Sequence, residues 1–248
     1  MPDPVAHEEP KEPAGQVLYA VIPAYNEAEN IEALVAEWLP VITAAGPDAR
    51  LVVIDDGSKD DTLELLRDLE RRSGEGLVVL SKPNSGHGAT LLHGYRYALD
   101  HGADFVFQTD SDRQTVPSEF PAFWELRDTA AAVIGWRRGR QDGFSRLIVT
   151  KVLKLVVRMV FRVSAPDANC PFRLMAAGPL RQALATIPPG HNLANVLVVV
   201  RLIQQGRTIR WIPVTFRPRQ GGVNSINIPK IVGIGRRALR DFWTLRRR

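Results

Sequence analysis

The first half of the chain alternates short apolar runs with longer amphipathic segments, and this alternation restricts the fold more than any other feature. Four runs rich in Val, Ile, Leu and Phe have the length of buried strands: Val17 to Ile22, Leu51 to Ile54, Leu77 to Leu80 and Phe105 to Gln108. Between them, three segments place apolar residues at three- and four-residue spacing, as amphipathic helices do: Ala28 to Leu39, Thr62 to Arg72 and Ala89 to Leu99. This order predicts an α/β fold, with a mainly parallel sheet and helices on both faces.

The second half is less regular. Its patterns predict strands at Ala131 to Ile134, Phe172 to Ala176 and Arg210 to Val214, and helices at Leu147 to Phe161 and Leu193 to Gln205. A length of 248 residues is ample for one domain and marginal for two. We therefore expect one domain at residues 16–225, between an acidic, proline-rich tail at 1–15 and a basic amphipathic segment at 226–248.

The composition excludes several classes of protein. With 45% hydrophobic and 24% charged residues, the chain is neither disordered throughout nor fibrous. The single cysteine, Cys170, rules out an intramolecular disulfide and a multi-cysteine metal site, and it suits a reducing compartment. The acidic start does not resemble a signal peptide, and no apolar stretch reaches the roughly 18 residues that span a bilayer.

The formal net charge of +5 predicts an anionic partner. Zinc-finger, RNA-binding and basic-zipper patterns are absent from the sequence, so we expect no nucleic acid. Val152 to Val163 and Ile226 to Leu245 instead interleave basic and apolar residues at helical spacing, which suits an anionic membrane surface. The alternative is an ordinary helix that packs on the domain with its basic face in water. The membrane interpretation predicts a peripheral protein at the cytoplasmic face of the membrane.

Polar loops follow the first three predicted strands, where a parallel sheet binds its ligands. They are Pro23 to Glu27, Asp55 to Thr62 and Lys82 to Gly88. Helix capping is an alternative role for Asn26 and for Asp60 or Asp61, but it does not account for Tyr25, Glu27 and Asp56. Gly86 and Gly88 suit either a tight turn or the close approach of the backbone to a ligand.

Two aspartates, Asp110 and Asp112, follow the fourth predicted strand. Carboxylates spaced i, i+2 at the end of a strand can converge on one hard divalent cation that also binds a diphosphate. This layout is typical of a metal-dependent nucleotide-sugar transferase. Taken alone, the pair favours a capped turn, because Asp and Ser bond to their own backbone there.

Taken together, the motifs make the chain resemble the inverting family 2 glycosyltransferases of the GT-A fold, within the polyprenyl-phosphate branch that is similar to dolichyl-phosphate mannosyltransferase. The resemblance runs from about Ala20 to Ser225 and depends on the order of the motifs more than on any one of them. They are Pro-Ala-Tyr-Asn-Glu at 23–27, Asp-Asp-Gly-Ser-Lys-Asp-Asp-Thr at 55–62, Asn-Ser-Gly-His-Gly-Ala at 84–89, Asp-Ser-Asp-Arg-Gln at 110–114, Pro-Phe-Arg-Leu at 171–174, and Arg219 with Gly221, Gly222 and Ser225. It implies a Rossmann-like GT-A domain that moves a sugar from a GDP- or UDP-sugar to a polyprenyl phosphate.

The resemblance also implies roles for individual residues. The base and ribose of the donor are expected on Pro23, Tyr25, Glu27 and Asp56, and the donor site also includes Gly86, Gly88 and Asp110. Mg²⁺ or Mn²⁺ is expected on Asp110, Asp112 and Gln114, and the catalytic residues are expected to be Asp110, Asp112 and Arg219.

The acceptor side departs from enzymes that use alcohol acceptors. Those enzymes usually need a carboxylate base in the second half of the chain, where this sequence has His191-Asn192-Leu193-Ala194-Asn195. An acceptor phosphate is already ionised and needs orientation and charge pairing instead. Arginines bind phosphate through a planar fork, and the candidates are Arg137, Arg140 and Arg219, with Ser225. His191 is either a replacement base or a structural residue.

Two variant segments leave the acceptor open. Residues 221–226 read Gly-Gly-Val-Asn-Ser-Ile where the branch often has Gly-Glu-Ser-Lys, and residues 169–173 read Asn-Cys-Pro-Phe-Arg. The alternatives are therefore a soluble small-molecule or saccharide acceptor, or a non-catalytic nucleotide-binding module. A nucleotidyltransferase is disfavoured because the first strand lacks a Gly-x-Gly-x-x-Arg start. The sequence specifies neither the sugar nor the oligomeric state.

Overall fold

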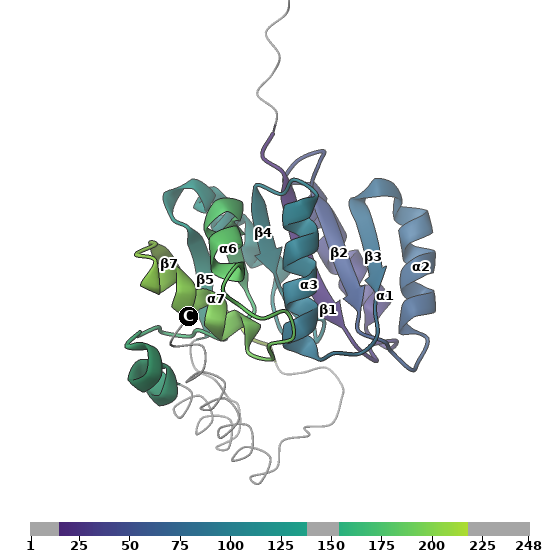
Figure 1. Ribbon diagram of the computed structural model, residues 1–248. Helices are drawn as coiled ribbons and strands as arrows, with labels where there is room; N and C mark the ends of the chain where they lie inside the picture. Colours follow the sequence, from purple (N-terminus) through teal and green to yellow (C-terminus); the bar gives the residue numbers. More distant parts are fainter. Residues whose placement is uncertain (1–14, 138–153, 218–248) are drawn as a thin grey trace, which may run out of the picture.

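A computed structural model describes residues 15–137 and 154–217, which form one seven-stranded sheet with the strand order β3-β2-β1-β4-β6-β5-β7 (Figure 1). The strands are β1 (Leu18–Ala24), β2 (Arg50–Asp55), β3 (Leu77–Ser81), β4 (Phe105–Gln108), β5 (Ala132–Arg137), β6 (Arg173–Ala176) and β7 (Ile209–Val214). Neighbouring strands are parallel except at β6, which runs antiparallel to both β4 and β5. The prediction of a mainly parallel sheet is confirmed.

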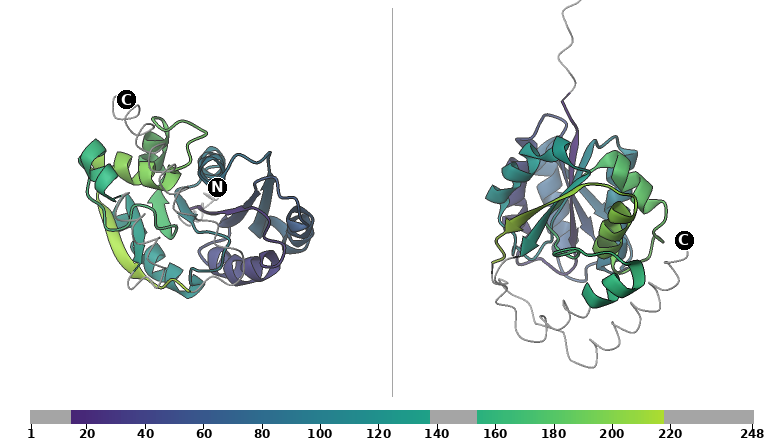
Figure 2. Two further views of the ribbon diagram at one scale, coloured as in Figure 1. Left: turned by 90° about the horizontal axis from the view of Figure 1, so that it is seen from below. Right: turned by 90° about the vertical axis from the view of Figure 1, so that its left-hand side faces the viewer.

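Helices cover both faces of the sheet (Figures 1 and 2). The helices are α1 (Ile31–Thr43), α2 (Thr62–Ser73), α3 (His87–Asp100), α4 (Phe120–Glu125), α6 (Ala177–Leu184) and α7 (Ala194–Gln204), with short 3₁₀ turns at Gly74–Gly76, Pro117–Glu119 and Arg127–Thr129. Residues 154–161 are also helical. The helices α3, α6 and α7 pack together on one face, and α1 lies on the other with α2 beside it.

Each predicted strand overlaps an observed one, whereas the predicted helices differ more at their ends. Helix α1 begins at Ile31 instead of Ala28, because the carbonyl of Glu27 accepts the amides of Asn30 and Ile31 in a preceding turn. It also continues through Pro40 to Thr43, beyond the predicted end at Leu39. Helices α4 and α6 were not predicted, because Pro121 and the Gly178-Pro179 pair are typical of turns.

Several predictions concern residues that the structure does not describe. The predicted helix at Leu147 to Phe161 is described only from residue 154 onward, and that part is helical. The basic segment at 226–248 and all of the tail before Gly15 lie outside the described residues, as do Arg140, Arg219 and Ser225. The domain limits at 16 and 225 therefore remain predictions.

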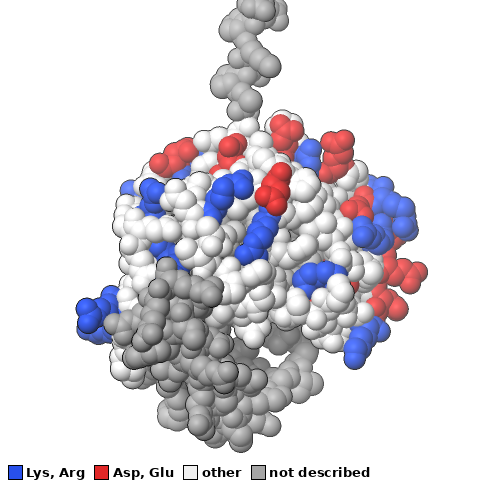
Figure 3. Space-filling view, viewed as in Figure 1, with Lys and Arg blue, Asp and Glu red and all other residues white. Residues whose placement is uncertain are grey.

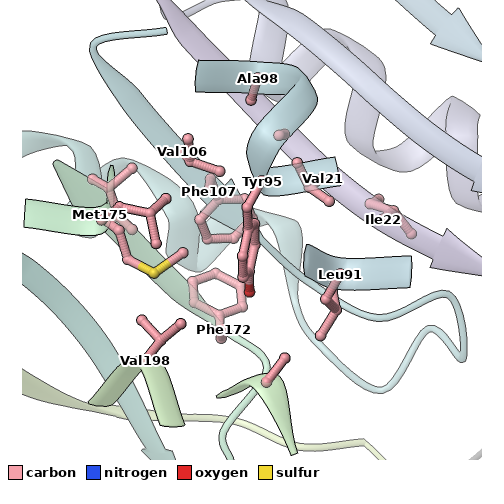
Figure 4. Close-up of a cluster of buried hydrophobic side chains, with 14 of the residues drawn as sticks. Val21, Ile22, Leu91, Tyr95, Ala98, Val106, Phe107, Phe172, Met175 and Val198 are labelled. Atoms are coloured by element: carbon pink, nitrogen blue, oxygen red, sulfur yellow. The ribbon is translucent and has the colours of Figure 1, made fainter. Parts of the chain in front are cut away.

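The core is dominated by aromatic and β-branched side chains on both sides of the sheet. Phe107 on β4 lies 5.4 Å from Trp38 of α1, 4.9 Å from Phe120 of α4 and 4.9 Å from Phe172, measured between ring centroids. Figure 4 shows the side of this cluster where Phe107 and Phe172 meet Tyr95 and apolar side chains of β1, α3, β6 and α7. Large rings bury much apolar area and prefer tilted or edge-on contacts such as these. They fix β4, which the aspartate pair follows, at the centre of the sheet.

The strand order changes direction between β1 and β4. From β1 the chain first builds outward through β2 to β3, and it then returns through α3 to place β4 on the other side of β1. The loops that leave the carboxyl ends of β1 and β4 consequently run to opposite sides of the sheet and leave a crevice between them. This crevice is where a ligand is expected.

Candidate active site

A pocket of about 370 Å³ opens at the carboxyl ends of β1 and β4. It is lined by Pro23, Ala24, Tyr25, Glu27, Asp56, Asn84, Gly86, His87, Thr90, Asp110, Ser111 and Asp112. Most of the predicted donor and metal residues are therefore brought together. Two of them, Gly88 and Gln114, are not part of the pocket lining.

The loops after β1 and β2 are tied to each other by side chain to backbone hydrogen bonds. Asn26 has a positive φ of 53°, its amide donates to the Ser58 hydroxyl (2.9 Å), and its side-chain oxygen accepts from the Lys59 amide (2.8 Å). The Glu27 amide donates to the Thr62 hydroxyl (2.9 Å). Asn26 is therefore not the cap of α1, whose N-cap residue is Asn30.

Asp60 serves both loops. One carboxylate oxygen accepts from the Thr62 amide at the start of α2 (3.2 Å), and the other accepts from the Ala28 amide (3.2 Å). Asp61 occupies the N-cap position of α2 but makes no side-chain capping bond. Asp60 thus bonds to the first amide of α2 without being its N-cap residue, and it also fixes the loop that carries Tyr25.

Glu27 joins the first loop to the aspartate pair. One of its carboxylate oxygens accepts from the Ser111 hydroxyl (3.2 Å), and the other accepts from the Asn30 side chain (3.1 Å). Tyr25 is 43% exposed at the pocket, although most large apolar side chains in the described residues are buried. An exposed ring beside a polar pocket suits stacking on a planar base.

Asp56 is buried beneath the β3–α3 loop and binds its backbone. Its two carboxylate oxygens accept from the amides of Ser85 and Gly86 (2.9 Å each), and Lys82 forms an ion pair with it. Burial alone would raise the pKa of Asp56, but the hydrogen bonds and the charge of Lys82 hold it below its ordinary value. The carboxylate is thus fixed in its charged form at the wall of the pocket.

Asp110 and Asp112 lie on the same side of the pocket. Asp110 accepts a hydrogen bond from the Gln108 side chain (2.9 Å), and the His87 ring nitrogen Nε2 lies 3.6 Å from the same carboxylate oxygen. Asp112 accepts from the Gln114 amide (3.2 Å). Arg113, which follows Asp112, adopts a positive φ of 55° and pairs with Glu37 of α1.

These aspartates fit a divalent cation that a substrate helps to hold. Within residues 15–137 and 154–217, no cluster of three or more His, Cys, Asp or Glu side chains could bind a metal by itself. Mg²⁺ is usually held by one or two carboxylates together with substrate phosphates, and it does not require a complete protein cage. Two hard oxygen donors at a pocket of this size match that pattern.

Gln114 makes a different contact from the one predicted for it. Its side-chain amide donates to the carbonyl of Arg217 (2.9 Å), and its own carbonyl accepts from the Arg217 amide (2.7 Å). It thereby ties the loop of the aspartates to the segment that follows β7 and leads to Arg219. A role for Gln114 as a metal ligand stays a prediction.

Gly88 is required by packing within the protein. A Cβ atom at this position would lie 2.4 Å from the carbonyl oxygens of both His191 and Asn192. Gly86, in contrast, has a positive φ of 88° and lines the pocket. The close approach expected at Gly88 is therefore made by the 191–192 backbone, and a donor contact there stays a prediction.

His191 lies beside the start of α3, and its Nδ1 atom accepts a hydrogen bond from the Leu193 amide (3.1 Å). In the neutral ring Nε2 then carries the proton, and the lone pair of Nδ1, which a base would need, already accepts this hydrogen bond. This arrangement favours the structural interpretation of His191 over the replacement base.

Arg137, predicted to bind the acceptor phosphate, is almost wholly buried and already engaged. Its guanidinium donates two hydrogen bonds to Asp167, at 2.7 and 2.9 Å, and it also lies over the ring of Phe216. Burial would lower the pKa of Arg137, but Asp167 raises it above its ordinary value. An acceptor phosphate would have to share this guanidinium with Asp167, so its role in the acceptor site stays a prediction.

The structure adds functional candidates that we did not single out from the sequence. Lys82 and Ser111 contact Asp56 and Glu27 respectively, and Asn84, His87 and Thr90 line the pocket. All of them lie in or next to motifs that were recognised, but the motifs alone do not indicate which side chains face the pocket.

A nucleotide-sized pocket at the point where the strand order reverses, with an Asp-x-Asp pair at its edge, defines the chain as a GT-A type α/β protein. Residues 19–178 match the family described as Glycosyl transferase family 2, and the chain belongs to that family.

Relatives and solved structures agree with this assignment. The chain is 26% identical over 221 residues to the undecaprenyl-phosphate 4-deoxy-4-formamido-L-arabinose transferase of Edwardsiella ictaluri (strain 93-146), a match that covers 88% of this chain and 66% of the relative. The protein of the same name from Aeromonas hydrophila is 32% identical over 160 residues, which are 64% of this chain and 48% of the relative. The chain thus spans about half to two thirds of the length of these relatives.

Among solved structures, the fold is similar to that of glucosyl-3-phosphoglycerate synthase from Mycobacterium tuberculosis. In its complex with Mn²⁺, UDP and glucosyl-3-phosphoglycerate, that structure gives a TM-score of 0.67 at 19% sequence identity, and the match covers 94% of this chain and 80% of the other. At this level of identity the comparison establishes the GT-A fold.

Proposed function

We propose that this chain transfers a sugar from a GDP- or UDP-sugar to a polyprenyl phosphate, with inversion at the sugar and with Mg²⁺ or Mn²⁺ as cofactor. The observation that carries the proposal is the pocket at the β1–β4 edge, in which Asp110 and Asp112 face the loops of Tyr25 and Asp56. Family membership and the names of the relatives support the same reaction.

The donor half of the pocket suits a nucleoside. Tyr25 offers an exposed ring for the base, while Pro23 and Ala24 supply an apolar wall. Asp56 and Glu27 place carboxylate oxygens where the N–H groups of a base and the hydroxyls of a ribose can donate to them. Gly86 lets its backbone approach the ligand closely.

Asp110 and Asp112 would hold the cation, with Gln114 nearby as the third predicted ligand. When bound, a divalent cation neutralises the charge that develops on the departing nucleoside diphosphate. The two aspartates alone give an open coordination sphere, so metal and donor are expected to bind together. Arg219, two positions after the Arg217 that Gln114 contacts, is the proposed cationic partner of the reacting phosphate.

The carboxylates that line the pocket indicate the kind of acceptor. Glu27 is hydrogen-bonded to Ser111 and Asn30, Asp56 is paired with Lys82, and the two remaining carboxylates form the proposed metal site. Among the described residues that line the pocket, every carboxylate therefore already has a role other than that of a base. A phosphate acceptor needs no base, because it is ionised at neutral pH and attacks the sugar directly. Arg137, Arg140, Arg219 and Ser225 are the proposed phosphate ligands.

A membrane-facing surface is proposed on the helix at residues 154–161. In the helical residues 154–161, Val156, Val157 and Val160 are buried, whereas Leu155 and Met159 are 55% and 57% exposed one helical turn apart. The exposed Lys154 and Arg158 flank them. This helix lies at the edge of the molecule where the parallel strands end (Figure 1). An apolar pair with basic neighbours suits the surface of an anionic leaflet.

The described residues contain no helix that is long and apolar enough to cross a membrane. Charges of both signs are interspersed on the face that carries α3, α6 and α7 (Figure 3). Contact with a membrane is therefore proposed through the 154–161 helix and the basic segment at 226–248, at the cytoplasmic face.

The experiment for catalysis combines a matched pair of variants with a panel of acceptors. Asp112→Asn should lower transfer by about 100-fold or more, because even partners of metal ligands are worth 10–100-fold. Asp48→Asn makes the same chemical change at an exposed carboxylate outside the pocket lining and should leave transfer unchanged. Full activity of Asp112→Asn after EDTA treatment would contradict the metal assignment.

The acceptor panel separates the two candidate functions. A short polyprenyl phosphate should accept sugar from one nucleotide sugar of a panel, while the matching unphosphorylated polyprenol should not. Transfer to the alcohol, or to a soluble saccharide but not to the phosphate, would overturn the lipid-phosphate proposal and leave the donor site intact.

Membrane contact is tested by flotation with anionic vesicles. Replacing Leu155 and Met159 together with Gln should reduce binding, and so should truncation after Gly233 or raised salt. Binding that none of these changes affects would exclude both surfaces.

A further inference from the structure

Four polar side chains are buried beneath the pocket, on the face of the sheet that α3 and α7 cover. Tyr95, Gln108 and Arg173 have no exposed surface, and Asn195 is 4% exposed. Burying polar groups is unfavourable unless they are hydrogen-bonded, and packing alone would be satisfied by apolar residues at all four positions. Their contacts lead to the proposed metal site.

The chain of contacts starts at Asp110. Gln108 donates from its side-chain nitrogen to Asp110 Oδ1 (2.9 Å). The Tyr95 hydroxyl lies 3.4 Å from the Gln108 oxygen and 3.1 Å from the side-chain oxygen of Asn195, so its single proton is shared between two amide oxygens. Figure 4 shows Tyr95 surrounded by apolar side chains of the buried cluster. Burial raises the pKa of Tyr95, so the hydroxyl stays protonated as a donor.

Arg173 holds the other end of this chain. It lies opposite Gln108 in the antiparallel pairing of β4 with β6. Its guanidinium donates to the carbonyls of Asn195 (2.9 Å), Cys170 (3.0 Å) and Ala168 (3.1 Å). The first turn of α7 and the loop before β6 are therefore fixed to β6, which pairs with β4, the strand that precedes Asp110.

We propose that Gln108, Tyr95 and Asn195 are positioning residues, which hold the Asp110 carboxylate in one orientation for the divalent cation, with Arg173 as their anchor. The terminal torsion of an aspartate is broad, so a carboxylate without a fixed partner samples many orientations. A hydrogen bond to Oδ1 selects one of them and leaves the remaining lone pairs for the cation. This inference rests on the proposed function, because it presumes that Asp110 is a metal ligand.

The experiment measures metal binding directly. Mn²⁺ is titrated into the protein in the presence of UDP or GDP, and the free ion is followed by electron paramagnetic resonance. Gln108→Leu, which removes the donor to Asp110, should weaken Mn²⁺ binding by about 10–100-fold. Tyr95→Phe removes only the hydroxyl oxygen and should weaken Mn²⁺ binding by a smaller factor. This second variant tests the proposal even if Gln108→Leu does not fold.

Two further variants separate positioning from general stability. Tyr97→Phe makes the same change on the same helix, two residues away, where the ring stacks on His101, and it should leave Mn²⁺ binding unchanged. Asn195→Leu should weaken Mn²⁺ binding. Asn195→Asp keeps an oxygen acceptor for the Tyr95 hydroxyl and should bind Mn²⁺ as well as the unaltered protein does. In activity assays the Mn²⁺ concentration for half-maximal rate should rise more than the rate at saturating Mn²⁺ falls.

The outcomes are distinguishable. If the unaltered protein binds no Mn²⁺ with either nucleotide, the proposed function fails. If it binds Mn²⁺ and the Gln108 and Tyr95 variants bind equally well, the positioning role is wrong while the metal site stands. If Tyr97→Phe weakens binding as much as Tyr95→Phe, the effect is a general loss of stability and the inference is also overturned.

Discussion

Replacing Gly88 with alanine tests the contact that holds the start of α3 against the backbone of residues 191–192. Gly88 lies in the first turn of α3, and its α-carbon faces the backbone of His191 and Asn192. The added Cβ would be 2.4 Å from two carbonyl oxygens, whereas ordinary van der Waals contact begins near 3.4 Å. Helix and loop must therefore separate by roughly 1 Å, and neither contact can be relieved by a side-chain rotation, because both involve backbone atoms.

Overpacking of this kind costs about 1–3 kcal/mol. The helix preference of alanine over glycine offsets at most about 1 kcal/mol of it. We therefore expect Gly88→Ala to lower the free energy of unfolding by about 1–2 kcal/mol, and the melting temperature by about 2–4 °C for each kcal/mol. Urea unfolding followed by circular dichroism measures the change.

Gly190→Ala is the matched control, because it lies in the same loop, has no positive φ and has no atom within 4 Å of the added Cβ. It should be neutral, or it should stabilise the protein by about 0.4–1 kcal/mol because alanine lowers the conformational entropy of the unfolded chain. Equal stability of Gly88→Ala and the unaltered protein, with donor affinity alone reduced, would refute the packing argument and assign Gly88 to the ligand.

Three other predictions follow from buried groups. The pKa of Asp56 is lower in the folded than in the unfolded protein, so its contribution to stability is present above about pH 4 and is lost as pH falls through the folded pKa. Asp56→Asn should thus destabilise the protein at pH 7 and progressively less below pH 4. A pH-independent difference in urea unfolding would contradict this. Burial raises the pKa of Cys170 to about 11, so a disulfide reagent at pH 8 should react with it only after unfolding, and rapid labelling of the native protein would show the thiol to be accessible. Removing Asp167 alone should cost about 3–5 kcal/mol by leaving the Arg137 charge buried, while Arg137→Met with Asp167→Leu should cost less than the sum of the single changes in a double-mutant cycle.

The sheet could be predicted because its signal is local. Each strand is a run of apolar residues bounded by polar ones, and β1 and β4 are recognisable from a few neighbouring positions. The reversal of β6 could not be predicted, because strand direction depends on the path of the chain before Arg173 and leaves no mark on a strand of four residues. Helix α6 was missed because Gly178-Pro179, typical of a turn, lies in its first turn.

The site was predictable to the level of its loops, and less so for single side chains. Asp110 and Asp112 were placed correctly at the pocket by their position after a strand. The pairing of Arg137 with Asp167, or of Asp56 with Lys82, joins residues 30 and 26 positions apart, and no periodicity encodes it. Gly88 shows a further limit, since the sequence marks a close approach there without specifying whether ligand or protein makes it.

The cross-links between the first two loops, from Asn26 to Ser58 and Lys59 and from Asp60 to Ala28, have a kinetic consequence. The loops keep their shape before any nucleotide arrives, so little conformational entropy is lost when the donor binds. Association should then follow a single phase whose rate rises linearly with nucleotide concentration. Selectivity among donors would accordingly be expressed in how long each one stays bound.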